Sequence, residues 1–158
     1  MKQFGFQFLL FISLLIIIAS CDDNRVFEKY KPVPVDGWNK DSLVVFNIPV
    51  SDTLQNNDLF VNIRNDVTYP YSNLWLFIQI NQPDGNALQD TFELSLADPA
   101  GKWLGRGYGG IKTRQVIYRR NVYFPVSGEY EIKIQHGMRE TDLKGIKDVG
   151  LSVQKSGS

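Results

Sequence analysis

Apolar and polar residues alternate with a period of two along most of the chain after residue 41, which is the spacing of β-strands. In the first such run, Val44, Phe46, Ile48 and Val50 fall on one face. The pattern predicts seven or eight strands, at residues 44–50, 59–64, 74–80, 91–96, 102–104, 116–124, 129–136 and 149–153. No run after residue 41 has the length and the period of about 3.6 residues of an amphipathic helix.

Two of these runs depart from simple alternation. In residues 74–80, Trp75 and Phe77 make the second face apolar as well, which predicts a central or covered strand. In residues 116–124, the alternation breaks where Arg119 and Arg120 stand side by side, which predicts a β-bulge.

Turn-forming residues separate the runs. Pro83-Asp84-Gly85-Asn86 predicts a hairpin turn, and the mostly polar residues 137–148 predict a connecting loop. Short strands divided by such turns are typical of an antiparallel β-sandwich. We therefore predict an all-β fold, a jelly-roll or immunoglobulin-like sandwich, as a single domain over residues 42–158.

The first 20 residues have a different pattern. Lys2 precedes an apolar stretch that is shorter than the about 20 residues of a membrane-spanning helix, as in a secretory signal peptide. Small residues then lead into Cys21, the only cysteine, as in a bacterial lipobox. The pattern predicts cleavage after residue 20 and attachment of diacylglycerol and palmitate to Cys21, and two or more acyl chains hold a protein stably at a bilayer. The alternative is an uncleaved anchor helix with an incidental cysteine.

Residues 21–41 are predicted to form a lipid-anchored tether. They carry charges, Pro32, Pro34 and Gly37, and they show little periodicity. Proline favours an extended backbone, which suits a spacer. We expect Val33 to Trp38 to dock on the domain and the acidic start to be mobile.

Composition limits the classes of partner. The full chain has 17 Lys and Arg against 17 Asp and Glu, and loss of residues 1–20 removes only Lys2, so the mature net charge is 16 − 17 = −1. This balance argues against a nucleic acid partner. The mature chain has no second cysteine, so its stability must come from packing rather than from an internal disulfide.

The chain lacks the residues for common catalytic or metal sites. His136 is the only histidine, and it continues the inward face of the run at 129–136, which predicts a partly buried residue whose hydrogen bonds are satisfied. One imidazole and an acylated thiol do not make a zinc site. Glu129 and Glu131 share an outward face beside Lys133 and read as a solvated surface rather than a glycosidase pair. We predict no enzyme activity, cofactor or metal.

Aromatic and basic residues near loops are the remaining candidates for contacts. Aromatic side chains stack on sugars and anchor protein partners, although most aromatics of a small sandwich belong to its core. The loop with Gly105, Gly107, Gly109 and Gly110 lacks the context of a phosphate-binding loop, which favours a structural role. The candidate ligand or partner contacts are Trp38, Tyr69, Tyr71, Trp103, Tyr108, Arg119 and Arg120.

Several strings resemble one family of bacterial lipoproteins. They begin with Cys21-Asp22-Asp23-Asn24-Arg25 and continue with Leu59-Phe60-Val61-Asn62-Ile63 and Ala97-Asp98-Pro99. The strongest are Phe124-Pro125-Val126-Ser127-Gly128 and Leu143-Lys144-Gly145-Ile146-Lys147. The chain resembles the gliding-motility lipoproteins called GldH, of the Bacteroidota, over nearly all of its mature length.

The resemblance implies a non-enzymatic lipoprotein of the outer membrane that works with gliding and type IX secretion proteins of the cell envelope. It provides no catalytic residues to transfer. The lipid is the expected membrane contact, and the domain is expected on the periplasmic or the surface side. The alternative function, based on the loop aromatics, is a glycan-binding module at the cell surface.

Overall fold

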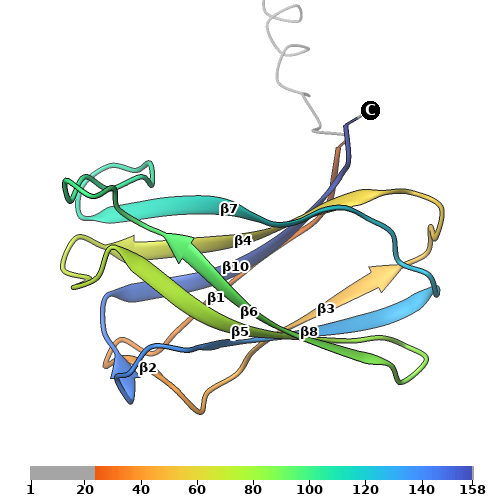
Figure 1. The fold of residues 1–158 in the computed structure, drawn as a ribbon, viewed down its shortest axis with the longest axis horizontal. Helices are drawn as coiled ribbons and strands as arrows, with labels where there is room; N and C mark the ends of the chain where they lie inside the picture. The colour runs from red at the N-terminus through yellow and green to blue at the C-terminus, as the bar shows by residue number, and fades with distance from the viewer. Residues whose placement is uncertain (1–23, 158) are drawn as a thin grey trace, which may run out of the picture.

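The computed structural model describes residues 24–157, and all their regular elements are β-strands. In chain order the strands are β1 (Arg25–Pro32), β2 (Trp38–Asn39), β3 (Val44–Val50), β4 (Asn57–Asp66), β5 (Asn73–Asn81), β6 (Ala87–Ser95), β7 (Ile111–Val122), β8 (Gly128–His136), β9 (Asp142–Leu143) and β10 (Ile146–Lys155) (Figure 1).

Two four-stranded antiparallel sheets form the sandwich. One sheet has the order β1-β10-β4-β7 and the other β3-β8-β5-β6, while the two-residue strands β2 and β9 pair with each other. Each long strand lies in the opposite sheet from the one before it, except within the β5–β6 hairpin. This is the order of a jelly roll. The predicted sandwich is therefore confirmed, and the jelly-roll alternative describes it better than the immunoglobulin-like one.

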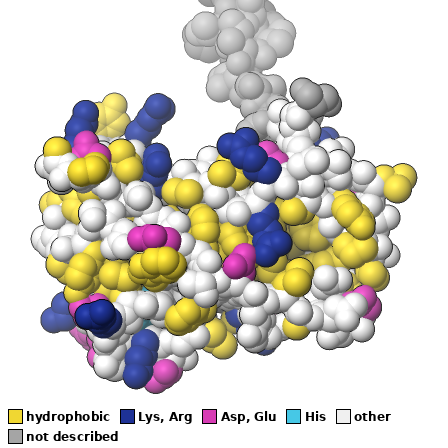
Figure 2. Space-filling model, in the orientation of Figure 1, with side chains coloured by type: hydrophobic (Ala, Val, Ile, Leu, Met, Phe, Trp, Pro, Cys, Tyr) yellow, Lys and Arg dark blue, Asp and Glu magenta, His cyan; other side chains and the backbone are white. Residues whose placement is uncertain are grey.

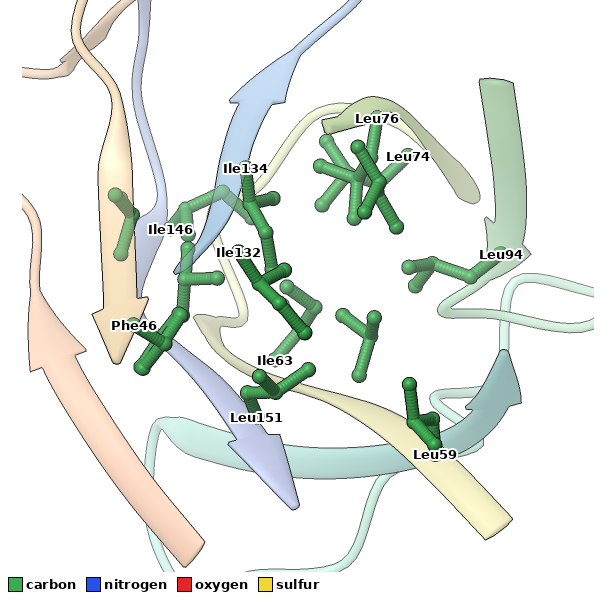
Figure 3. Packing of buried hydrophobic residues seen from close by; sticks show 14 of the residues in the cluster. Phe46, Leu59, Ile63, Leu74, Leu76, Leu94, Ile132, Ile134, Ile146 and Leu151 are labelled. Carbon is green, nitrogen blue, oxygen red and sulfur yellow. The ribbon is translucent and has the colours of Figure 1, made fainter. Parts of the chain in front are cut away.

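The core lies between the two sheets, where alternate side chains of every long strand point inward. Phe46 and Ile132 come from the β3-β8-β5-β6 sheet and meet Ile63 and Leu151 from the other sheet (Figure 3). All four side chains are fully buried or nearly so. The period of two thus sorts apolar residues into the space between the sheets, as the sequence predicts.

The predicted tether is wrong from Arg25 onward, because β1 is an edge strand of the sandwich. β1 pairs along β10, with Phe27 opposite Val153, and the Phe27 ring lies in the core. Lys29 and Lys31 share the face of Phe27, opposite Leu151 and Val149 of β10, and they stay exposed because β1 lies at the edge of the sheet. The expected docking of the following segment is confirmed, since Val33 and Trp38 are both buried.

Three smaller predictions differ from the structure. Residues 102–104 form no strand and contribute only the bridge between Ala97 and Trp103. Strand β7 begins five residues before the predicted start, at Ile111. The predicted loop at 137–148 contains β9 and the start of β10. The β-bulge is confirmed, because the register between β4 and β7 shifts where Leu59 faces Arg119.

The expected signal peptide and Cys21 lie outside the described residues. Within residues 24–157, the structure contains no helix of the length and apolar character needed to span a bilayer.

Gly145 offers a test of this packing. Its φ is +87°, and an added Cβ would lie 2.7 Å from the Cα of Tyr69. Gly85 has nearly the same φ, +89°, but an added Cβ there has open space. We expect Gly85→Ala to lower the free energy of unfolding by about 1 kcal/mol and Gly145→Ala to lower it by at least about 1 kcal/mol more. Urea unfolding of both variants measures the difference, and equal losses would contradict the packing described for Gly145.

Candidate functional site

The outer face of the β3-β8-β5-β6 sheet is the described surface that best suits binding. Trp75 and Phe77 stand two residues apart on β5, so both point away from the core. Their exposed fractions are 39% and 49%. Exposed neighbouring aromatic rings on a central strand are unusual without a partner, because such rings provide large contact areas.

Polar side chains of the adjacent strands surround these rings. Phe77 lies opposite Thr91 of β6 and Gln135 of β8, and Gln79 lies opposite Gln89 and Lys133. With Leu43, which is half-exposed, these residues line an open hollow of about 550 Å³. The Lys133 ammonium forms a 2.8 Å ion pair with Glu131, so the hollow is polar without a strong charge of one sign.

A second hollow, of about 490 Å³, borders Trp75. Tyr71, Met138 and Glu140 line it. The Tyr71 hydroxyl donates a hydrogen bond to the Glu140 carboxylate, and this bond raises the pKa of Tyr71 and lowers the pKa of Glu140. We refer to the two hollows together with Trp75 and Phe77 as the outer face.

Gly137 helps to place the Phe77 ring. An added Cβ at Gly137 would lie 3.1 Å from two carbons of that ring. The missing side chain therefore lets the ring lie close to the end of β8.

The sequence pattern placed Trp75 and Phe77 on a second apolar face but did not show that this face is open. Strand β5 is central, between β8 and β6, as predicted. The second face is uncovered because each sheet of a sandwich packs on one side only. The sequence feature that indicates this site is the run at 74–80, which has apolar residues on both faces.

Two of the predicted contact residues are wrong, because they are buried. Trp38 is 0% exposed, its indole Nε1 donates a 3.0 Å hydrogen bond to the backbone oxygen of Ser42, and its ring meets His136 edge-on. Tyr69 is also buried, and its hydroxyl donates to the backbone oxygen of Asn73 at 2.9 Å. Burial raises the pKa of Tyr69. Both residues build the core and the turns next to it.

The other predicted aromatic contacts lie apart from one another. Tyr71 lines the outer face, whereas Trp103 is partly buried against the core. Tyr108 is fully exposed at the glycine loop before β7. Lys and Arg side chains gather with hydrophobic ones over this loop, at the upper left of Figure 2. The sequence therefore identified one residue of the outer face, Tyr71.

The two predicted basic contacts have different environments. The Arg119 guanidinium bonds the Asp90 carboxylate at 2.8 Å and so joins β7 to β6 across the two sheets. Burial alone would raise the pKa of Asp90, but hydrogen bonds from Arg119 and Tyr118 lower it overall. Arg119 therefore has a structural partner, while Arg120 is exposed and stays a candidate contact.

The described residues do not form a metal site. No group of three or more His, Cys, Asp or Glu within residues 24–157 has a suitable arrangement. His136 is buried, as expected, and the backbone of Trp38 lies beside its imidazole. Burial lowers the pKa of His136 from 6.5, against the opposing effects of a hydrogen bond with the Trp38 backbone and of the Glu140 and Asp142 carboxylates.

The buried histidine makes stability depend on pH. Because its pKa is lower in the folded than in the unfolded chain, the unfolded chain binds more protons below pH 6.5. The protein is then fully stabilised above that pH and loses stability as the pH falls from 6.5 towards the folded-state pKa. We expect His136→Phe to reduce the loss of urea stability between pH 7.5 and pH 5.5. An unchanged loss would contradict the buried, neutral state of His136.

Comparisons of the sequence with known proteins point to one family. The GldH lipoprotein family model matches residues 25–153. A gliding motility lipoprotein GldH homolog of Christiangramia forsetii is 40% identical, over 96% of this chain and 97% of its own. The gliding motility lipoprotein GldH of Flavobacterium johnsoniae is 38% identical, over 89% of this chain and 91% of its own.

Among solved structures, a family GH115 4-O-methyl-α-glucuronidase is similar with a TM-score of 0.45 and 11% identity, over 87% of this chain and 18% of that one. This likeness is too weak to bear on function. The family model and both relatives cover most of the chain, and the chain therefore belongs to the GldH lipoprotein family.

Proposed function

We propose that this gliding motility lipoprotein is an outer-membrane component of the machinery that links gliding to type IX secretion. In this proposal it has no enzymatic activity and acts through contacts with other envelope proteins. The observation that carries the proposal is the match to the two GldH relatives over most of the chain, at 38% and 40% identity. Lipid on Cys21 is proposed to hold the protein at the membrane.

The outer face is the proposed contact surface. Trp75 and Phe77 have the size and exposure of the aromatic anchors that dominate many protein interfaces. The polar residues around them resemble the rim of such an interface. A partner that covers both hollows would remove these rings from water.

Deletion of the gene in its native organism tests the proposal. We expect surface movement and the export of type IX secretion substrates to fall together, and expression of the intact gene to restore both. Unchanged movement and export would overturn the proposed role.

A glycan-binding role is the second candidate, and one arrangement favours it. The exposed ring of Phe77 shares a hollow with the amides of Gln79, Gln89 and Gln135, and Trp75 shares the other hollow with Asn73. Rings with amides suit sugar faces and hydroxyl groups. Calorimetric titration with surface polysaccharides of the native organism tests it. Binding that is lost in Trp75→Ala would support this role, and no binding would exclude it.

A further inference from the structure

We propose that one end of the sandwich, the end where β1 begins, rests on the lipid surface and places Leu54 and Tyr123 in the interfacial layer. This inference rests on the proposed acylation of Cys21. It goes beyond that proposal because it assigns a second membrane contact, made by the folded domain itself.

The first argument is the short connection between the lipid and the fold. The backbone nitrogen of Lys155 donates a 2.8 Å hydrogen bond to the oxygen of Asn24, so the sandwich already holds the chain at that residue. Three residue steps separate Asn24 from Cys21, which is about 11 Å even at full extension. Strand β10, with 10 residues, is about 33 Å long. The anchored end must therefore lie near the bilayer.

The loops of this end are known from the strand pairing. The backbone nitrogen of Ser156 donates to the oxygen of Asn56, which ties the loop at 51–56 to the end of β10. Val50 lies opposite Gly128, so the loop before β8 is at the same end. Figure 1 shows β1 and the C-terminus leaving the sandwich together. We call residues 51–56 and 123–127, with the start of β1, the anchored end.

The second argument is that the anchored end holds an apolar side chain outward. Leu54 is 92% exposed. The Asp52 carboxylate accepts hydrogen bonds from the backbone nitrogens of Leu54 at 2.9 Å and Gln55 at 3.2 Å. Such bonds define a tight turn, which fixes the backbone and so keeps Leu54 at the surface.

Further apolar surface lies beside it. Tyr123 is 62% exposed and Val26 is 49% exposed. Tyr123 and Pro125 border a hollow of about 120 Å³, and Val26 and Val50 border another of about 150 Å³. Tyrosine is enriched where lipid meets water, because its ring is apolar and its hydroxyl is polar.

Charge at the anchored end has both signs. Arg120 and Lys155 are exposed cations, and Asp52 and Glu129 are exposed anions. The mixture does not favour anionic lipid over neutral lipid, so the contact is expected to depend on the apolar residues. The lipid on Cys21 is at most about 11 Å from Asn24 at full extension, so the bilayer is the surface that this end would contact.

The test uses the full chain, processed and acylated in bacterial membranes and then placed in vesicles of phosphatidylethanolamine and phosphatidylglycerol. Leu54→Cys is labelled with a nitroxide, and collisions with oxygen and with a water-soluble nickel complex are measured. Tyr108→Cys is the control, because Tyr108 is fully exposed and lies beyond the other end of the strands. Tyr123→Cys provides a second site at the anchored end.

We expect nickel collisions at positions 54 and 123 to be several-fold lower than at 108, and oxygen collisions to be higher. Equal collision rates at 54, 123 and 108 would overturn the inference. Lower rates with both oxygen and nickel at 54 and 123 would also overturn it, because protein rather than lipid would then cover this end. Labelling of the unsubstituted chain separates the two proposals, because acylated Cys21 has no free thiol. If the unsubstituted chain takes no nitroxide and the collision rates at 54, 123 and 108 are equal, only the lipid contact is refuted. If the unsubstituted chain is labelled, Cys21 is not acylated, and both the acylation and this inference are refuted.

Discussion

Cys21→Ala is expected to release the protein from the membrane fraction and to abolish its labelling by palmitate. The thiol of Cys21 is the only one in the chain, so the variant has no other site for a thioether-linked lipid. Two or more acyl chains give stable anchoring, whereas an apolar contact such as that of Leu54 alone is weak and reversible. Fractionation and labelled palmitate measure the two effects.

Asp22→Ala is the matched control, since it changes the adjacent residue and keeps the thiol. It should retain both the label and the membrane location. Label that persists in Cys21→Ala would contradict the lipobox. A membrane-bound variant without label would instead favour the uncleaved anchor helix.

Trp38→Ala should cause the second large effect, a loss of about 3–5 kcal/mol in the free energy of unfolding. The indole is completely buried, and its removal leaves a cavity beside His136 and an unpaired oxygen on Ser42. Denaturant unfolding at neutral pH measures the loss.

Trp75→Ala is the control, because it removes the same side chain from the open outer face. Its loss should be about 1 kcal/mol or less. If Trp38→Ala and Trp75→Ala lowered the free energy of unfolding equally, the indole of Trp38 would not be part of the core. That result would support Trp38 as a surface contact.

The period of two was enough to predict most of the sandwich. The predicted bounds of β3 are those observed. Those of β5 differ by one residue at each end and those of β8 by one residue at the start. Each of these strands buries one face, so apolar residues at every second position identify its inward side chains. The alternation does not predict the order of the strands in each sheet, because that order depends on which connections cross from one sheet to the other.

The two main errors have related causes. The sequence of β1 is typical of a tether because charged residues stand on both of its faces and Phe27 is its one buried residue. The position of Trp38 beside a turn favours a surface contact, yet Trp38 belongs to β2, pairs with Leu143 of β9 and is buried. In both cases the partner segment is more than 100 residues away, at β10 and β9.

The candidate site was only partly predictable. Sequence alternation puts Trp75 and Phe77 on one face, but an apolar face is equally consistent with burial. Only the arrangement of the two sheets shows that this face is outward and open. Tyr71 was identified because it lies next to a turn, which is where its contact with Glu140 forms.

Photo-crosslinking from the outer face in living cells tests the central claim most directly. A photoreactive amino acid replaces Phe77, which is half-exposed on β5, and in a control it replaces Lys29, which is exposed on β1 of the other sheet. We predict that position 77, but not position 29, gives an adduct identified by mass spectrometry as an envelope protein of the gliding or secretion machinery. No protein adduct at position 77, in cells whose movement depends on the gene, would contradict the proposal that the protein acts through contacts at this face.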